Sequence, residues 1–159
     1  MIDEICFSTA LLEGAQEVFE TMVFMEIEEA SDLDFKIEGE SLLGSITFSN
    51  ALEGCLAIRC NWLCAKVIAV NMLGLDPSDD ISDEEICDAI GEITNMVMGS
   101  VKSRAADETG DLQVSIPIVV RGQNMANSLG ERANRVVVKA STDEEHAIEF
   151  SFLYRKGKE

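Results

Sequence analysis

Apolar residues recur at helical spacing between residues 82 and 102, and they leave one narrow polar stripe along that segment. Ser82 and Glu85 have the spacing of a capping box, which predicts a helix start. At about 100° per residue, one side of the helix would collect aliphatic side chains: Ile86, Ile90, Ile93, Val97 and Val101. The opposite stripe would fall within roughly 80° and consists of Asp88, Glu92, Asn95, Gly99 and Lys102. The pattern therefore predicts a helix with one buried face and a short polar edge.

Two other segments have the pattern of helices. Residues 8–25 place apolar side chains at helical spacing, and either Ser8 or Thr9 could cap the start. Residues 62–73 form a third expected helix, which Asn61 could cap.

Alternating or continuous apolar runs predict strands between these helices. The expected strands are 34–38, 42–48, 55–60, 112–120, 135–140 and 147–154, with a hairpin connection at 50–54 and a polar loop at 122–134. Two long helices packed on one mainly antiparallel sheet form the natural arrangement of these elements. We therefore expect an α+β fold, a two-layer α/β sandwich, with residues 1–159 in a single domain and a flexible tail at 156–159.

A weak internal pseudo-duplication accompanies this pattern. Residues 16–23 align with residues 91–98, and each segment is followed by an expected strand hairpin. Any two amphipathic helices can align this well, so the sequence alone leaves open whether the two halves are related.

The net charge of the chain restricts the kinds of partner that it can bind. The 159 residues include 12 Lys and Arg but 30 Asp and Glu, for a formal net charge of −18. This charge argues against nucleic acid and against anionic membrane surfaces, both of which require clustered cations. A partner that is basic at its contact point fits it better. Without a signal-peptide pattern or a long apolar run, we expect a cytoplasmic protein.

Five cysteines raise the question of a metal site: Cys6, Cys55, Cys60, Cys64 and Cys87. They form no C-x-x-C pair, and the only histidine, His146, is remote in sequence. We therefore interpret them as small buried apolar residues in a reducing compartment.

The polar stripe is the best candidate for chemistry, because the chain has no G-x-S-x-G, P-loop or H-E-x-x-H motif. An amide such as Asn95 can accept and donate hydrogen bonds at once, which suits holding a water molecule in line with a phosphorus atom. Glu92 could pair with a lysine of a partner. Gly91 and Gly99 each cost about 1 kcal/mol relative to alanine, which is explicable if something approaches the helix closely. The spacing by itself also fits an ordinary solvated helix face.

The run from Asp88 to Lys102 resembles the active helix of the CheC/CheX/FliY family of bacterial chemotaxis phosphatases. The pattern of that family is an acidic residue or serine, three residues, Glu, two residues, Asn, and a proline some twenty residues further on. Asp88, Glu92 and Asn95 match it, and Pro117 lies in approximately the expected place. The resemblance covers most of the chain, including the order of helices and strands.

The resemblance implies a function and a role for each residue. It implies hydrolysis of the aspartyl phosphate of the response regulator CheY, with Asn95 orienting the attacking water and Glu92 pairing with a lysine of CheY. Asp88, Gly99 and Lys102 would lie in the partner-binding surface, and no mechanistic role follows for Asp88. The chain would need no cofactor of its own, because CheY would supply Mg²⁺ along with the phosphorylated aspartate.

Members of the CheC type carry two such motifs, one on each long helix. Here the first helix has Glu17 and Glu20 where glutamate and asparagine would be needed. A carboxylate at position 20 would repel a phosphoryl group and could not donate a hydrogen bond to it. The chain is therefore similar to the CheX type, with one site, and this type implies a homodimer.

Two alternatives remain beside the enzyme. One is a non-catalytic CheY-binding or flagellar-switch adaptor module of the same fold, and the other is an unrelated acidic interaction domain. Asn95 favours the enzyme, because simple docking does not require an amide that orients water.

Overall fold

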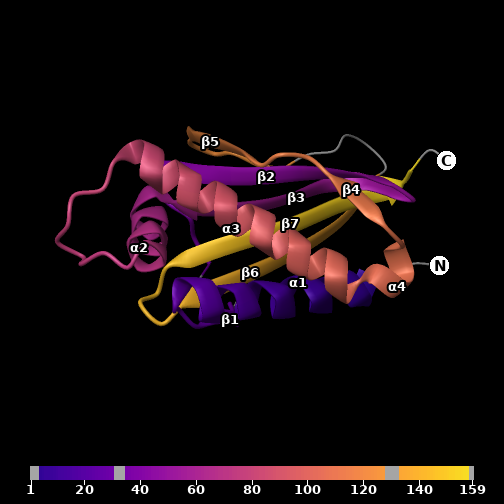
Figure 1. Ribbon diagram of the computed structural model, residues 1–159, viewed down its shortest axis with the longest axis horizontal. Coiled ribbons are helices and arrows are strands. Elements are labelled where there is room, and N and C mark those ends of the chain that lie inside the picture. Colours follow the sequence, from indigo (N-terminus) through magenta and orange to yellow (C-terminus); the bar gives the residue numbers. More distant parts are fainter. Residues whose placement is uncertain (1–3, 31–34, 128–132, 158–159) are drawn as a thin grey trace.

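A seven-stranded antiparallel sheet is the centre of the fold (Figure 1). The computed structural model describes residues 4–30, 35–127 and 133–157. Its helices are α1 (Glu4–Val18), the π-helical turn η1 (Phe19–Val23), α2 (Trp62–Met72), α3 (Asp83–Arg104) and α4 (Ala106–Thr109). Its strands are β1 (Ile27–Glu29), β2 (Ser41–Asn50), β3 (Leu52–Asn61), β4 (Leu112–Val114), β5 (Ile118–Gly122), β6 (Asn134–Thr142) and β7 (Ala147–Lys156).

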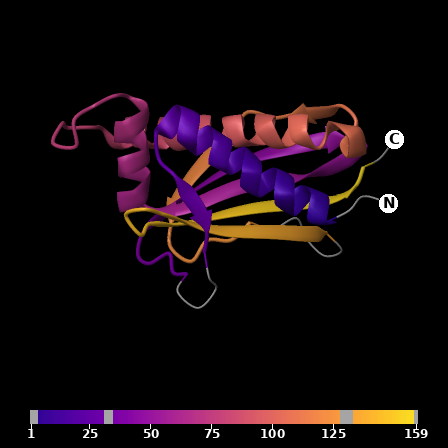
Figure 2. The same ribbon diagram turned by 90° about the horizontal axis from the view of Figure 1, so that it is seen from below.

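The strands are ordered β1-β6-β7-β3-β2-β4, and β5 pairs with the same edge of β2 as β4 does. Both long helices lie on one face of this sheet, and α2 stands at one end of it (Figure 2). Helix α3 packs on α1 and α2 and, among the strands, mainly on β2, whereas α1 packs on β6 and β7. The predicted α+β sandwich is confirmed.

The face of the sheet under the helices forms the apolar core. Alternate residues of β2, β3 and β7 point toward the helices and are buried, as the period of two in a strand requires. Phe152 stacks between Phe7 of α1 and Phe48 of β2, with ring centroids 4.9 Å apart in both pairs. Aromatic side chains from a helix and two strands thus join the two layers.

The two segments of the pseudo-duplication correspond to two similar halves of the fold, each with a long helix and a strand hairpin. Hairpins β2–β3 and β6–β7 meet at the centre of the sheet, where β3 pairs with β7. Each hairpin is covered by the long helix of the other half, because α1 lies on the second hairpin and α3 lies on the first. The two halves are therefore interlocked.

Several boundaries differ from the prediction. Helix α1 already includes Glu4, so Ser8 and Thr9 lie inside the helix and do not cap it. Of the expected strand 34–38, residues 35–38 form no strand although they alternate, and residue 34 lies outside the described residues. The edge of β6 is paired with β1 at Ile27–Glu29 instead. A period of two is not sufficient without a partner strand.

The expected strand 112–120 is two strands. Ser115 donates its backbone N–H to the carbonyl of Thr47 (2.9 Å) and accepts the N–H of Thr47 on its Oγ (3.0 Å). Pro117, which has no N–H, then interrupts the ladder before β5 begins.

The hairpin and the tail also differ. The connection is shorter than 50–54, because only Ala51 separates β2 from β3 and Asn50 takes a φ of 127°. Lys156 belongs to β7, and Gly157 donates its N–H to Ala51 (2.9 Å), so neither residue is a loose tail. Residues 158–159 of the expected tail lie outside the described residues. None of the described helices is both long enough and apolar enough to cross a membrane.

The contact between α3 and β2 is unusually close. A Cβ atom at Gly44 of β2 would lie 2.3 Å from Oγ1 of Thr94 and 3.1 Å from Cγ2 of Ile90, both on α3. Thr94 cannot simply move away, since its hydroxyl donates to the carbonyl of Ile90 (2.7 Å). The bare backbone at Gly44 therefore lets the helix rest directly on the strand.

We predict that Gly44→Ala lowers the free energy of unfolding by about 1–3 kcal/mol, because it overpacks this contact. In the Thr94→Ala background the same change should cost less, because the closest obstacle is gone. Gly99→Ala serves as a matched control: a Cβ there meets nothing within 4 Å. That control should raise the free energy by about 0.5–1 kcal/mol, from helix propensity. Urea denaturation of the four variants measures these free energies of unfolding. An equal loss of stability from Gly44→Ala in both backgrounds would show that Thr94 is not the obstacle.

Candidate functional site

Helix α3 is strongly specified at both ends. Ser82 Oγ accepts the backbone N–H of Glu85 (3.1 Å), and Glu85 Oε1 accepts that of Ser82 (3.3 Å), so the predicted capping box is present. Acidic residues occupy the first turn, and Lys102 and Arg104 occupy the last one, which complements the helix dipole. These features start the helix at a defined residue and so fix which side chains face outward.

The polar stripe lies on the exposed edge of α3. Asp88, Glu92, Asn95 and Gly99 are exposed, whereas all five aliphatic residues predicted for the opposite side are buried. Within the described part of the chain, Asn95 makes no side-chain hydrogen bond and Glu92 makes no ion pair. One amide and one carboxylate, one helical turn apart, are therefore available to another molecule.

Two stripe assignments need refinement. Gly91, where we expected something to approach the helix closely, is buried, and a Cβ there would lie 3.5 Å from Val119 of β5. The group that approaches Gly91 is thus the protein's own edge strand. Lys102 is half-buried and its Nζ lies 3.4 Å from Asp111 Oδ1, so it already has a partner within the chain.

A hollow of about 310 Å³ lies beside Asp88 and Glu92. Its apolar wall consists of Ala89 and of four larger side chains from η1, the end of α2 and α3: Met22, Met72, Leu73 and Met96. We call these four residues the methionine crevice. Met96 lies on α3 with the stripe, whereas Met98, two residues further on, is buried in the core. The other three residues are distant from the stripe in sequence, and no spacing rule connects them to it.

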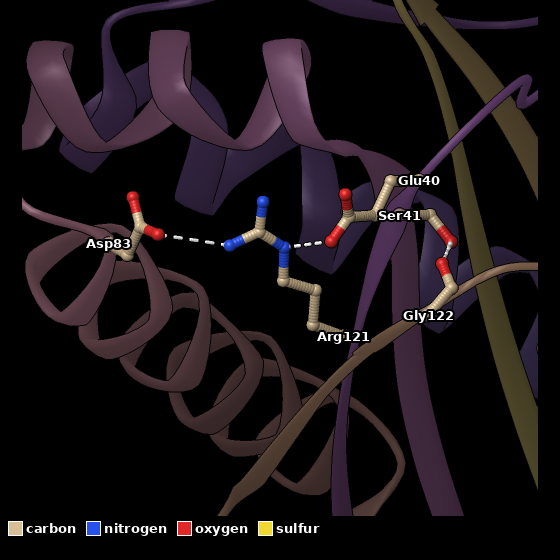
Figure 3. Close-up of polar contacts among 5 residues, drawn as sticks. All are labelled: Glu40, Ser41, Asp83, Arg121 and Gly122. Atoms are coloured by element: carbon tan, nitrogen blue, oxygen red, sulfur yellow. Dashed lines mark hydrogen bonds and ion pairs between the residues drawn. The ribbon is translucent and has the colours of Figure 1, made fainter.

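Arg121 of β5 anchors the beginning of α3. Its guanidinium donates to the carboxylates of Glu40 and Asp83, the latter at 3.0 Å (Figure 3). It also lies 3.7 Å above the ring of Trp62. The hydrogen bond to the Glu40 carboxylate is the main reason why the pKa of Arg121 is raised. Beside it, Ser41 Oγ donates to the carbonyl of Gly122 (3.3 Å). Strand β5 is thereby tied to α2 and α3 at once.

The first long helix offers a different surface at the positions that align with the stripe. Glu17 is held by Arg104 of α3, with 2.6 Å between Oε2 and Nη2. Glu20 is exposed in the π-helical turn η1. An acid already paired within the chain, followed by a second acid, does not reproduce the exposed carboxylate and amide of α3.

The cysteines behave mostly as expected. Cys55, Cys60 and Cys64 are buried, while Cys6 and Cys87 are half-buried. Burial raises the pKa of Cys55, and a hydrogen bond with Cys64 together with burial raises the pKa of Cys60 well above its usual value. These thiols stay protonated at neutral pH. In the part of the chain that the structure describes, no group of three or more His, Cys, Asp or Glu side chains could hold a metal ion.

His146 lies in the turn between β6 and β7, half-buried, with its Nε2 3.8 Å from Glu144 Oε2. It belongs to neither α3 nor the hollow beside it.

Comparison with known proteins identifies a family. The family model described as chemotaxis phosphatase CheX matches residues 42–141, well over half of the chain. That match includes all of α2, α3, β4 and β5, and with them every residue of the polar stripe. No curated protein sequence matches the chain.

Solved structures share the fold. The chemotaxis protein CheX of Vibrio vulnificus superposes with a TM-score of 0.80 at 24% identity, and the alignment covers 98% of this chain and 100% of that one. CheX in a CheX–CheY–BeF₃–Mg²⁺ complex from Borrelia burgdorferi has a TM-score of 0.73 at 20% identity, covering 98% and 100%. FliY of Thermotoga maritima has a TM-score of 0.64 at 18% identity, covering 92% and 85%.

Proposed function

The chain belongs to the chemotaxis phosphatase CheX family, and on that premise we propose that it hydrolyses the aspartyl phosphate of the response regulator CheY. The observation that carries the proposal concerns two groups on an exposed helix edge, one turn apart: among the described residues, the amide of Asn95 has no hydrogen-bond partner and the carboxylate of Glu92 has no ion pair. An edge of this kind can enter the active site of another protein.

Each group has a task in the proposed reaction. Asn95 Oδ1 accepts a hydrogen bond from a water molecule while Nδ2 donates to a phosphoryl oxygen, which holds the water in line with phosphorus. The water oxygen bonds to phosphorus, the bond from phosphorus to the aspartyl oxygen breaks, the aspartate leaves as a carboxylate, and inorganic phosphate is released as H₂PO₄⁻ with both protons of the water. Glu92 pairs with a lysine of CheY and so fixes the helix in register.

We assign the remaining requirements of the reaction to the partner. CheY would supply the phosphorylated aspartate and Mg²⁺, which neutralises charge on the phosphoryl oxygens in such reactions. A structural neighbour of this chain has been solved as a complex with CheY, BeF₃ and Mg²⁺, which supports a partner of this kind. The net charge of −18 supports a contact surface that carries a lysine.

A homodimer is the second part of the proposal. Four of the eight exposed large apolar side chains in the described residues lie in one stretch along the β4–β5 edge: Val114, Ile116, Ile118 and Val120. Strand β5 pairs with β2 on one side only, as far as the structure describes the chain. An exposed apolar edge strand is a ready surface for a second copy, so we propose that two chains meet at β5.

We predict that Asn95→Ala slows release of phosphate from phosphorylated CheY by about 10²-fold, which corresponds to roughly 2.7 kcal/mol of barrier, with the fold intact. Glu20→Ala is the matched control on the first helix and should leave the rate unchanged. A phosphate-release assay measures both. A wild-type rate in Asn95→Ala would remove its assigned role, and a large loss in Glu20→Ala would point to a second site. If wild-type protein binds CheY without hydrolysis, the adaptor function replaces the enzyme.

Reversing the charge at Glu92 tests the proposed lysine contact. Glu92→Lys should weaken the complex with CheY by at least tenfold, because two cations would face each other across the contact. Glu13→Lys, which makes the same change of charge at an exposed position of α1, should weaken it much less. Calorimetric titration gives both affinities, and equal values for the two variants would argue against the pairing.

The dimer is tested at the β5 edge. Wild-type protein should sediment as a dimer, and the double variant Ile116→Lys, Ile118→Lys should sediment as a monomer, because cations at an edge strand oppose pairing. These two side chains are 83% and 63% exposed, so their replacement should not disturb the fold. The control is Leu63→Lys on α2, with a side chain 61% exposed, which should remain dimeric. A monomeric wild-type protein would contradict the proposal.

A further inference from the structure

The methionine crevice is formed by parts of the chain that only the fold brings together. Met22 comes from the π-helical turn η1, Met72 and Leu73 come from the end of α2, and Met96 comes from α3. Met22 and Leu73 are 43% and 49% exposed, and the other two are half-buried. The crevice therefore has an apolar wall that solvent can reach.

Met22 is held in place by unusual backbone. It belongs to a π-helical turn, which ends at Phe24 with a φ of 60°, and Met25 donates its N–H to the carbonyl of Phe19 (3.0 Å). π-Helical turns are rare and occur often at functional sites, and a phenylalanine at positive φ is strained. Here the irregular turn ends α1 beside α3 and contributes Met22 to the wall.

The rim of the crevice carries charge of one sign. Glu85, Asp88 and Glu92 line it, and none of the described residues that line it is a lysine or an arginine. Asp88 and Glu92 make no ion pair within the described residues. An apolar wall with an acidic rim best fits an apolar side chain that has a cation beside it on the same surface. Methionine suits such a contact because its flexible thioether adapts to the shape of the inserted group.

The same carboxylate belongs to both surfaces, since Glu92 lines the crevice and is also the acid of the stripe. A protein whose lysine reaches Glu92 from the side of the crevice places the neighbouring part of its surface over Met96 and Leu73. We propose that the methionine crevice receives an apolar side chain of CheY beside that lysine, and that this contact determines which receiver domain the protein accepts. The inference rests on the proposed function, and it supplies the specificity that the polar stripe alone lacks.

The test compares two leucines at the two ends of α2. Leu73→Lys removes an apolar contact and places a cation against the cation expected from CheY, whereas Leu63→Lys makes the same change outside the crevice. Affinity is measured for CheY carrying beryllium fluoride and Mg²⁺, a stable analogue of the phosphorylated state that does not require turnover. We expect Leu73→Lys to weaken binding about tenfold or more and Leu63→Lys to leave it within about twofold.

Kinetics give a second readout that a disturbed fold would not reproduce. Leu73→Lys should raise the KM for phosphorylated CheY and leave kcat nearly unchanged, because the crevice acts in docking and does not touch the reacting atoms. Met22→Gln should act in the same direction from another element.

The outcomes separate this inference from the proposed function. If wild-type protein hydrolyses CheY phosphate and the Leu73→Lys and Leu63→Lys variants bind CheY equally well, the proposed role of the crevice is rejected. The proposed enzymatic function is then retained. If wild-type protein binds CheY tightly without hydrolysis, and Leu73→Lys loses that binding, the role of the crevice is supported and the enzymatic function is rejected. Loss of self-association in Leu73→Lys without a change in CheY affinity would assign the crevice to a second copy and overturn the inference.

Charge at the rim is tested separately. Asp88→Ala should slow association with CheY and flatten its dependence on ionic strength, whereas Glu13→Ala, with the same change of net charge, should not. Identical salt dependence in the two variants would show that the rim does not face a cation, and would overturn that part of the inference.

Discussion

The direct contact of α3 with β2 at Gly44 is the constraint on which the rest of the structure depends. Because Gly44 has no side chain, Thr94 and Ile90 reach the strand itself, and three sides of the helix become buried. Ile86, Ile93, Val97 and Val101 fill the space over the sheet, while Gly91 accommodates β5. Only a strip of α3 can then remain exposed. A helix held less closely would present a broader and less defined polar surface.

The exposed strip of α3 offers only an amide and a carboxylate as reactive groups. A partner must therefore supply the other groups that the proposed reaction requires. An amide can orient water but cannot act as a general base, and a carboxylate without a metal or a cation cannot stabilise a phosphoryl group. The groups of this chain become sufficient only in contact with a partner that brings the phosphorylated aspartate, a lysine and Mg²⁺. In this proposal, binding and catalysis are the same event, because the amide is placed by the docking of its helix.

The interlocked halves of the fold show how similar elements acquire different uses. Both long helices lie on a hairpin of the other half, and both carry a glutamate at the corresponding place. In α1 that glutamate, Glu17, is neutralised by Arg104 from the opposite helix. Helix α1 then ends in a π-helical turn that adds Met22 to the crevice beside α3. The proposed docking surface thus draws on the first helix for packing, while the second helix keeps the polar groups.

The sequence by itself determined features that depend on neighbours along the chain. Helical periodicity and the Ser82–Glu85 capping box gave the span of α3 and the side on which Glu92 and Asn95 lie, because a helix fixes the direction of each side chain from its position. Tertiary structure decided the features that depend on contacts between distant segments of the chain. It assigned the edge of β6 to β1 and not to residues 35–38, and it divided residues 112–120 where Pro117 could not continue the ladder. It also brought Met22, Met72 and Leu73 beside the stripe, since local periodicity carries no information about which helix ends meet.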